Sequence, residues 1–324
     1  MRHHIVFLDQ EGIGPSVKMT ELPFPHTWES HAYTNPDQVV ERLKHATVAM
    51  TCSVPLRAEH LRQLPRLEMI SLALTGTDIV DLDYCHDNGI TVTNVPAYAA
   101  NTVAEHALAM IFELSRKVGS YHRLLREVHL GNAPVKNIYF DFPIRDVGGR
   151  TLGIVGNGPI AHRLAALAQG VGLRVQFSDR NGEFRGDGYV PLQRLLADSD
   201  IISINCPLTE ETRDMIGAAE LARMKPGVLL VNTARGGIIN EAALIEALQA
   251  GRIGGAALDV VEHEPLRRDD PLFALIDRHD FILNPHVAWS SEDAMQGLID
   301  QALGNITAHV RGEAPANAIL KVQP

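Results

Sequence analysis

The stretch Gly153–Ala161 reads GIVGNGPIA, an apolar strand that runs directly into a glycine turn and then into a helix. Its glycine pattern is G-x-G-x-x-A. Gly156 permits the tight turn, Gly158 lets the backbone come close to a pyrophosphate, and small Ala161 allows the helix to pack closely on the sheet. A glycine pattern alone often marks only a turn, but strand, turn and helix occur here in the order that a dinucleotide site requires.

The residues that follow the glycine turn also favour a dinucleotide. Pro159 suits the first helical turn, and the helix that it opens with Ile160 presents unpaired N–H groups and a partial positive charge to phosphates. Asp179 ends the next predicted strand about 20 residues after the turn, where a carboxylate bonds the ribose 2′-hydroxyl. It would repel a 2′-phosphate, so NAD is expected rather than NADP, although Arg180 can soften that preference. The alternative is that Asp179 only caps a helix.

Short apolar runs alternate with helical patterns on both sides of this motif, which is typical of an α/β fold. Most predicted strands are nearly all apolar, as expected when helices cover both faces of a parallel sheet. These strands span residues 5–8, 47–51, 69–74, 152–155, 174–177, 201–204, 228–231 and 255–260. Helices are predicted at 37–45 and 291–310, and another begins where Asn101 and Thr102 can cap it. Apolar residues recur in it at three- and four-residue steps, namely Val103, Ala107, Met110, Ile111 and Leu114.

At 324 residues the chain is long enough for two domains, each with its own core. We place a nucleotide-binding domain at residues 99–288 and a second domain at residues 1–98 and 289–324, to which the last helix returns. Between Tyr121 and Arg150 the helical pattern weakens and aromatic residues lie among polar ones. An extended arm or a subunit contact is expected there.

The composition excludes several classes of protein. Hydrophobic residues make up 45% and charged residues 21%, which is typical of a globular chain. The net charge of −10 would repel a phosphate backbone, so nucleic acid is not an expected partner. No apolar run is long enough to predict a membrane span. Cys52, Cys85 and Cys206 are widely spaced, which indicates neither a disulfide framework nor a metal site and favours the cytoplasm.

Polar residues follow three predicted strands at the edge where open α/β sheets bind ligands. They lie in residues 226–237 (PGVLLVNTARGG), 257–265 (ALDVVEHEP) and 284–289 (NPHVAW). Taken singly, Arg235 could cap a strand end, Glu264 could lie in a solvated turn, and His286 could be a buried structural imidazole. Their joint occurrence beyond strand ends favours a reacting centre.

With these segments the chain resembles the D-isomer-specific 2-hydroxy acid dehydrogenases over nearly its whole length. The resemblance also rests on residues 93–96 (TNVP), 103–106 (VAEH) and 205–209 (NCPLT). It implies two Rossmann-like domains with parallel sheets, the larger an NAD-binding domain inserted into a flavodoxin-like substrate domain. It also implies hydride transfer between NAD(H) and a small D-2-hydroxy acid or 2-keto acid, and a homodimer whose contact we place in the arm from Tyr121 to Phe142.

The resemblance assigns roles to individual residues. Arg235 matches the arginine that holds the substrate carboxylate and carbonyl, His286 the acid/base that protonates the carbonyl oxygen, and Glu264 its partner. A fixed cation and a proton donor that titrates near neutral pH both suit a keto group that becomes negatively charged. Asp259 resembles the residue near the nicotinamide carboxamide. The backbone that would line the cofactor cleft, beside His286, belongs to Cys206, Pro207, Thr233 and Ala234.

The expected substrate contacts come from both predicted domains. Segments 53–55 and 75–77 are expected to offer backbone N–H groups to the substrate carboxylate. The full set of expected contacts is Val54, Thr75, Gly76, Arg235, His286 and Trp289. Two further histidines are expected to have other roles: His263 is expected to be peripheral, and His106 to be a packed histidine of the linking helix.

Glycerate and hydroxypyruvate, or glycolate and glyoxylate, are the expected substrate pairs, because residues 140–144 and 286–289 look most like dehydrogenases of those acids. Phosphoglycerate is a less favoured alternative, since Thr51–Leu56 carries no basic residue for a phosphate. Ala97 and Ile79 depart from the family pattern, which often has glycine and asparagine there. An NAD(H)-sensing protein of the corepressor type, with little turnover, stays open as a different class of function.

Overall fold

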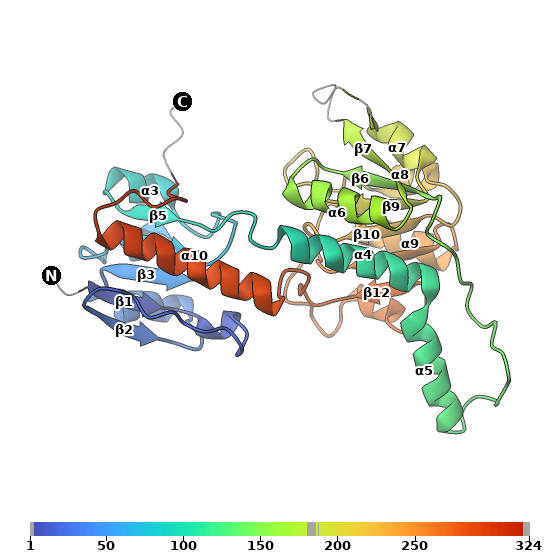
Figure 1. Cartoon of the computed structure of the whole chain (residues 1–324), viewed down its shortest axis with the longest axis horizontal. Helices are drawn as coiled ribbons and strands as arrows, with labels where there is room; N and C mark the ends of the chain where they lie inside the picture. The colour runs from blue at the N-terminus through green and yellow to red at the C-terminus, as the bar shows by residue number, and fades with distance from the viewer. Residues whose placement is uncertain (1–2, 180–185, 187, 320–324) are drawn as a thin grey trace. The chain divides into compact units, whose positions relative to one another are not determined.

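The computed structural model describes residues 3–179, 186 and 188–319, and the chain divides into two compact units (Figure 1). Unit 1 is made of residues 1–99 and 290–324, and unit 2 of residues 100–289. Unit 2 is therefore an insertion between the two parts of unit 1. No helix within the described ranges combines the length and the apolar character needed to cross a membrane.

Unit 1 is built on a parallel sheet, which has five strands among the described residues, in the order β2-β1-β3-β4-β5. This order is flavodoxin-like. The strands are β1 (His3–Phe7), β2 (His26–Ser30), β3 (Val48–Thr51), β4 (Met69–Leu72) and β5 (Thr91–Thr93). The strands predicted at 5–8, 47–51 and 69–74 are confirmed to within two residues. The edge strand β2 was not predicted, because the sequence HTWES is mostly polar and no residue of it is fully buried.

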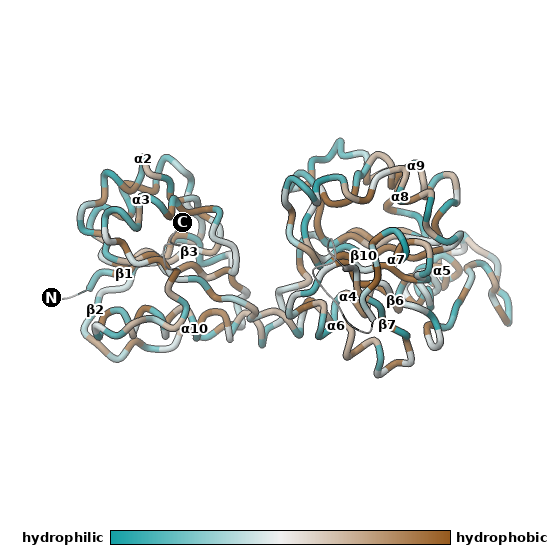
Figure 2. Tube along the Cα trace, turned by 90° about the horizontal axis from the view of Figure 1, so that it is seen from above, coloured by the Kyte–Doolittle hydropathy of each residue, from teal (hydrophilic) through white to brown (hydrophobic). Residues whose placement is uncertain are grey.

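Helices cover both faces of this sheet. The helices α1 (Val39–Leu43), α2 (Ala58–Leu61) and α3 (Leu82–Asp87) share a hydrophobic core with the strands. The last helix α10 (Glu292–Val310) packs against β4, where Ser71 Oγ donates to the carbonyl oxygen of Ala302 (3.2 Å) (Figure 1). Short 3-10 turns lie at Gln10–Gly12 and Pro36–Gln38. The strands form hydrophobic layers between more polar helices and loops (Figure 2).

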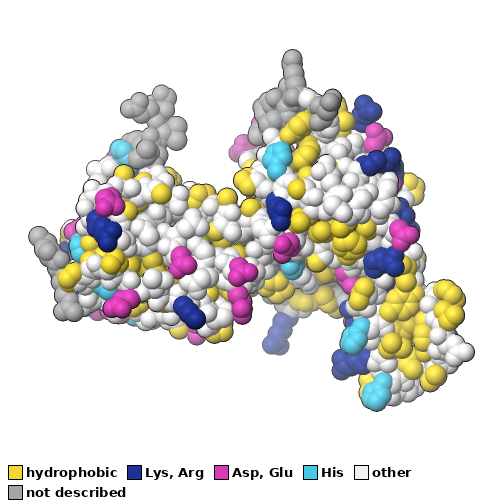
Figure 3. Space-filling model, in the orientation of Figure 1, with side chains coloured by type: hydrophobic (Ala, Val, Ile, Leu, Met, Phe, Trp, Pro, Cys, Tyr) yellow, Lys and Arg dark blue, Asp and Glu magenta, His cyan; other side chains and the backbone are white. Residues whose placement is uncertain are grey.

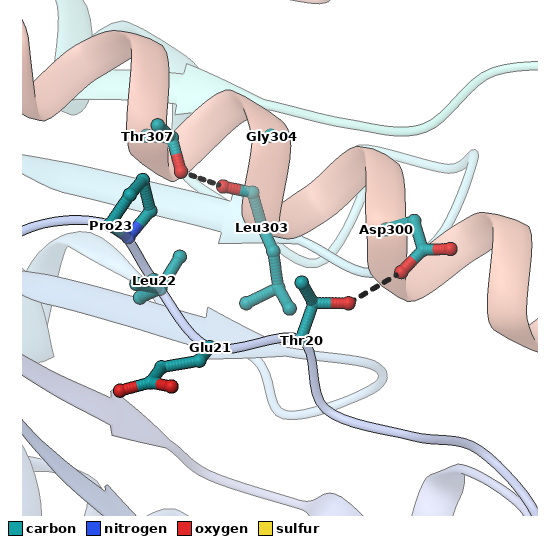
Figure 4. A pocket seen from close by; sticks show the side chains of 8 residues that line it. All are labelled: Thr20, Glu21, Leu22, Pro23, Asp300, Leu303, Gly304 and Thr307. Atoms are coloured by element: carbon teal, nitrogen blue, oxygen red, sulfur yellow. Dashed lines mark hydrogen bonds between the residues drawn. The ribbon is translucent and has the colours of Figure 1, made fainter.

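A shallow pocket of unit 1 lies between the segment Thr20–Pro23 and α10 (Figure 4). Leu22 and Leu303 line it, and the hydroxyl of Thr20 donates to the carboxylate of Asp300 (3.1 Å). The contact fastens the segment before β2 to the last helix.

Unit 2 carries a parallel sheet with seven strands in the described part of the chain, in the order β12-β11-β10-β9-β6-β7-β8. Around β6 this is the Rossmann order, in which the direction of winding reverses between β6 and β9. The strands are β6 (Thr151–Val155), β7 (Arg174–Asp179), β8 (Tyr189–Pro191), β9 (Ile201–Ile204), β10 (Leu229–Asn232), β11 (Gly255–Leu258) and β12 (Phe281–Leu283). Ligands bind beyond the carboxyl ends of such strands, so this reversal fixes where a cofactor site can lie.

Two groups of helices cover the sheet of unit 2. The helices α4 (Ala100–Arg116) and α6 (Pro159–Gly170) pack on each other and share one core with the strands. The helices α7 (Leu192–Asp198), α8 (Ala218–Arg223) and α9 (Glu241–Gln249), with the 3-10 turn Pro271–Leu275, contribute to a second core. The central strands contribute residues to both cores, as Ile201 does to the first and Ile202 to the second, which explains their apolar sequences.

Two details of the sequence prediction are wrong. The helix α4 begins at Ala100, so Asn101 and Thr102 lie inside its first turn rather than capping it; Asn101 instead bonds Glu105 and Arg163 (2.6 Å each). The start of the predicted arm is also helical, because α5 spans Val118–His129. Its apolar residues are largely exposed, so the usual link between apolar spacing and a buried face does not hold there.

Candidate active site

The glycine turn after β6 lies at the point where the winding of the sheet reverses. Gly156 has a φ of +130°, and a Cβ there would lie 2.3 Å from the carbonyl oxygen of Asn205, which follows β9. The N–H of Asn205 donates to the carbonyl oxygen of Val155 (2.7 Å). Glycine is therefore required at this position because two backbone segments cross in contact.

Glycine at position 158 has a different role. It is the N-cap of α6, and a Cβ built there would meet no atom within 4 Å among the described residues. Pro159 follows at the first helical position with Ile160 beside it, and Ala161 is completely buried against the sheet. The open space is thus in front of the helix N-terminus, where its N–H groups face outward. Asp179 is the last residue of β7, and Arg180 lies outside the described residues.

Two buried polar atoms at the carboxyl ends of β9 and β10 lack partners in the described part of the chain. They are Oδ1 of Asn205, beyond β9, and Oγ1 of Thr233, beyond β10. The Asn205 amide is oriented by its nitrogen, which donates to Ser203 Oγ (2.8 Å). A buried acceptor or hydroxyl without a partner is costly, so these atoms suit a bound polar group. With the open turn and the half-buried Cys206, the residues fit a dinucleotide.

The segments after β11 and β12 bring Glu264 and His286 together. His286 Nδ1 donates to Glu264 Oε2 at 2.7 Å, and Glu264 Oε1 accepts from the N–H of Val261 (3.1 Å). Because a carboxylate can only accept, the hydrogen bond places a proton on Nδ1 and leaves Nε2 as the nitrogen that can exchange one. The His286 side chain is 41% exposed, so a small molecule can reach it.

The Glu264 carboxyl has a pKa below its ordinary value. Burial is the largest influence and raises this pKa, but hydrogen bonds from His286 and Val261, together with the charges of His286 and Arg235, outweigh it. Glu264 is therefore an anion at neutral pH. The charge of Arg235 contributes to this lowering of the pKa, and its guanidinium donates to the carbonyl oxygen of Ala234 (2.8 Å).

The backbone of the Arg235 loop is fixed on both sides. The amide of Asn232 bridges it, since Nδ2 donates to the carbonyl oxygen of Arg235 (2.8 Å) and Oδ1 accepts from the N–H of Ala234 (3.0 Å). A Cβ at Gly236 would lie 1.8 Å from the carbonyl oxygen of Val261, so this glycine lets the Arg235 loop contact the loop that carries Glu264. Sequence reasoning missed Asn232, whose role follows only from the folded turn.

Asp259 anchors the loop that carries His286. Its side chain is 1% exposed, and its carboxylate oxygens accept from the N–H groups of Val287 and Ala288 (2.9 Å each). Its carbonyl oxygen accepts from the N–H of His286 (2.8 Å). His286 has a φ of +55°, which is unfavourable for a residue with a Cβ, so these bonds hold a strained conformation. The expected contact of Asp259 with the nicotinamide stays a prediction.

The sequence also singled out three other residues of unit 2. His263 is exposed, and the imidazole that bonds Glu264 belongs to His286. His106, which was expected only to pack, has its Nε2 2.9 Å from Nδ2 of Asn284, two residues before His286. Trp289 is half-buried.

In unit 1 the prediction that residues 53–55 offer free N–H groups is wrong. The N–H of Ser53 donates to the Asp9 carboxylate (2.7 Å), and that of Val54 donates to Thr51 Oγ1 (2.9 Å). Pro55 has no N–H. The Val54 side chain is 3% exposed and belongs to the core of the unit. Sequence spacing could not reveal that Asp9, a buried aspartate two residues after β1, already occupies this turn.

The loop at Thr75, Gly76 and Thr77 is different. None of the described residues accepts a hydrogen bond from these three backbone N–H groups. Carbonyl groups of the loop are instead held from outside, that of Thr75 by Asn94 Nδ2 and that of Asp78 by Arg57 (2.7 Å each). The loop thus presents adjacent donors, which suits an anion.

The comparisons with known proteins agree with this geometry. A family model described as D-isomer specific 2-hydroxyacid dehydrogenase, NAD binding domain, matches residues 108–288. The chain belongs to the D-isomer-specific 2-hydroxyacid dehydrogenase family. A glycerate dehydrogenase of Methylorubrum extorquens is 43% identical to it and covers 98% of this chain and 99% of its own length. A glyoxylate reductase of Korarchaeum cryptofilum is 37% identical, over 92% of this chain and 91% of its own length.

A solved structure shares the fold of this family member over nearly its whole length. A D-lactate dehydrogenase of Treponema pallidum superposes with a TM-score of 0.78 at 29% identity, over 99% of this chain and 100% of that chain. The cofactor of the chain is NAD, and its reaction is hydride transfer between NAD(H) and a 2-hydroxy or 2-keto acid. The predicted family, fold class, reaction class and cofactor are confirmed.

Proposed function

We propose that the chain reduces a small 2-keto acid to the D-2-hydroxy acid, with Arg235, Glu264 and His286 as its reacting groups. The substrate pair is hydroxypyruvate and glycerate, or glyoxylate and glycolate, by likeness to the relatives named for glycerate and glyoxylate. The observation that carries the proposal is the 2.7 Å hydrogen bond from His286 Nδ1 to Glu264, a carboxylate whose pKa the charge of Arg235 also lowers.

Substrate orientation is the role of Arg235 and of the donor loop in unit 1. The planar guanidinium binds a carboxylate at two points, which fixes the adjacent carbonyl carbon for attack. We assign unit 1 as the substrate domain, with the N–H groups of Thr75 and Gly76 as its donors to the substrate carboxylate, and unit 2 as the NAD-binding domain. The glycine turn at Gly156 and Gly158 and the end of β7 at Asp179 would hold the cofactor.

Proton transfer is the role of His286. NADH, when bound, would supply the hydride from its dihydronicotinamide ring. As the carbonyl carbon gains the hydride, the carbonyl oxygen takes a proton from His286 Nε2, and the reverse transfers run in the oxidative direction. Glu264 keeps a proton on Nδ1 and stabilises the imidazolium before the proton leaves. Arg235 stabilises the negative charge that develops on the oxygen.

A kinetic panel of keto acids with NADH and NADPH tests the proposed substrate class. We expect fast NADH oxidation with hydroxypyruvate or glyoxylate and slow oxidation with branched keto acids, and the reverse ranking would refute it. Tight NADH binding with negligible turnover on every keto acid would instead indicate a sensing protein.

We also propose a homodimer that forms through α5 and the segment up to Ile144. This part of unit 2 exposes large apolar side chains, which Figure 3 shows as a hydrophobic patch over α5, and such patches mark interaction surfaces. The exposed residues are Val118, Leu125, Leu130, Val135, Ile138, Phe140 and Ile144.

The three cysteines form no disulfide, which supports a cytoplasmic location; fractionation of cells that express the protein checks it.

A further inference from the structure

The proposed mechanism leaves His106 without a role, although it contacts the catalytic loop. His106 lies on α4, and its Nε2 is 2.9 Å from the side-chain nitrogen of Asn284. The two residues are 178 positions apart in the sequence. Asn284 follows β12 and precedes His286 by two residues. The contact therefore joins a helix on one face of the sheet to the loop at its carboxyl edge.

The direction of this hydrogen bond follows from its atoms. An amide nitrogen can only donate, so Nδ2 of Asn284 donates and Nε2 of His106 accepts. The carboxylate of Asp259 lies 3.9 Å from the same Nε2, which is beyond hydrogen-bond distance, and its oxygens already accept from Val287 and Ala288. His106 thus holds Asn284, while Asp259 holds the residues after His286.

His286 needs support from both directions because its φ of +55° is strained. Backbone hydrogen bonds to the last residue of β11 and to the residue after it hold the loop. The N–H of Asn284 donates to the carbonyl oxygen of Leu258, and that of His286 donates to the carbonyl oxygen of Asp259 (2.8 Å each). The Asn284 side chain is fixed by α4 through His106. Loss of this contact leaves the Asn284 side chain without its bond to α4, two residues before the strained His286.

We infer that His106 is a positioning residue for the reduction: it accepts the hydrogen bond of Asn284 and so fixes the loop that directs His286 Nε2 toward the substrate carbonyl. This inference rests on the proposed role of His286. A shift of a proton donor by a fraction of an ångström lowers the rate of the chemical step while leaving binding largely unchanged.

The test compares substitutions at His106 that keep or remove the acceptor. In His106→Gln the amide oxygen can reach the place of Nε2, whereas the shorter His106→Asn cannot, and His106→Phe keeps the ring without an acceptor. With the most active keto acid of the panel and saturating NADH, we expect kcat to fall about tenfold in the Phe and Asn variants and to recover largely in the Gln variant. Equal activity in all three, or a change only in NADH affinity, would overturn the inference.

A double-mutant cycle with His286→Ala separates positioning from general structural damage. If His106 acts through His286, His106→Phe has no further effect on the residual turnover of the His286→Ala variant. If His106→Phe lowers that residual turnover by the same factor as in the unsubstituted enzyme, His106 does not act through His286. Full activity of His286→Ala itself would refute the proposed function rather than the role of His106.

Discussion

Glu264 uses both carboxylate oxygens in the folded protein, one for His286 and one for the N–H of Val261. In the sequence His263 adjoins Glu264 and is therefore a rival to His286 as its partner, although it is expected to be peripheral. The fold resolves the choice, since the residue that meets the carboxylate comes from the loop after β12. Such contacts depend on the tertiary structure, so the spacing of residues in the sequence does not reveal them.

The lowered pKa of Glu264 predicts how stability depends on pH. A carboxyl whose pKa is lower in the folded than in the unfolded chain stabilises the fold above its ordinary value of 4.5, and this contribution disappears as pH falls through the lowered folded pKa. We expect the stability difference between the unsubstituted protein and Glu264→Gln to be constant from pH 7 to about 5 and to shrink below. Urea unfolding at each pH measures it. A constant difference down to pH 3 would contradict the assignment.

The same variant should lose activity at neutral pH. Glutamine can accept from Nδ1 but carries no charge to stabilise the imidazolium, so kcat should fall about 100-fold while NADH affinity is retained. Steady-state kinetics and NADH titration check this. Unchanged kcat would mean that Glu264 does not support proton transfer.

Asp179 should set the choice between NAD and NADP. We expect Asp179→Ala to lower the ratio of kcat/KM for NADH to that for NADPH by about 10- to 100-fold, because it loses a charged hydrogen bond to the ribose and a repulsion of the 2′-phosphate. The substitution Asp198→Ala, at the end of α7, is a control that should leave the ratio unchanged. A ratio that does not change in Asp179→Ala would sink the assignment.

The turn between β6 and α6 contains two glycines for which we expect different roles, Gly156 in folding and Gly158 in cofactor binding. Gly156→Ala places a Cβ against the backbone of Asn205 at a positive φ, and we expect it to cost about 3 kcal/mol or more of stability. Gly158→Ala meets open space at an allowed φ, so its stability should change by no more than about 1 kcal/mol.

The two variants should differ in cofactor affinity as well. A methyl at Gly158 occupies the space through which the backbone approaches the pyrophosphate, so the NADH dissociation constant should rise about tenfold or more. Fluorescence titration of NADH and thermal unfolding distinguish the cases. If Gly158→Ala binds NADH normally, the open space before α6 is not the phosphate site.

The central strands were predictable because burial on both faces leaves them nearly continuous apolar runs, as in Ile201–Ile204. The edge strand β2 and the helix α5 were not predicted for the opposite reason. Most of their residues are exposed, so their sequences lack the pattern of apolar residues that a buried face produces. The reacting residues were predictable as a set from strand ends. The supporting Asn232 and the occupied turn at Ser53 were not, because they require backbone hydrogen bonds that only the folded loops reveal.

For the whole molecule, the exposed apolar surface of α5 and the following segment predicts assembly. We expect Phe140→Asp, at a side chain that is 87% exposed, to shift the protein from dimer to monomer without unfolding it. Sedimentation over a range of concentrations measures the change. Tyr33→Ser, at an exposed aromatic residue of unit 1, is the matched control and should leave the assembly intact. A monomeric unsubstituted protein would contradict the prediction.

The insertion of unit 2 within unit 1 has a consequence for biosynthesis. A ribosome releases β1 to β5 first, but α10, which contacts β4, emerges only after all of residues 100–289. During that interval one face of the first sheet, including Met69, lacks the helix that covers it in the folded protein. The nascent chain therefore exposes an aggregation-prone apolar surface while the inserted unit folds. The synthesis of residues 100–289 sets the length of this exposure, and chaperone demand should peak just before Glu292–Val310 leaves the exit tunnel.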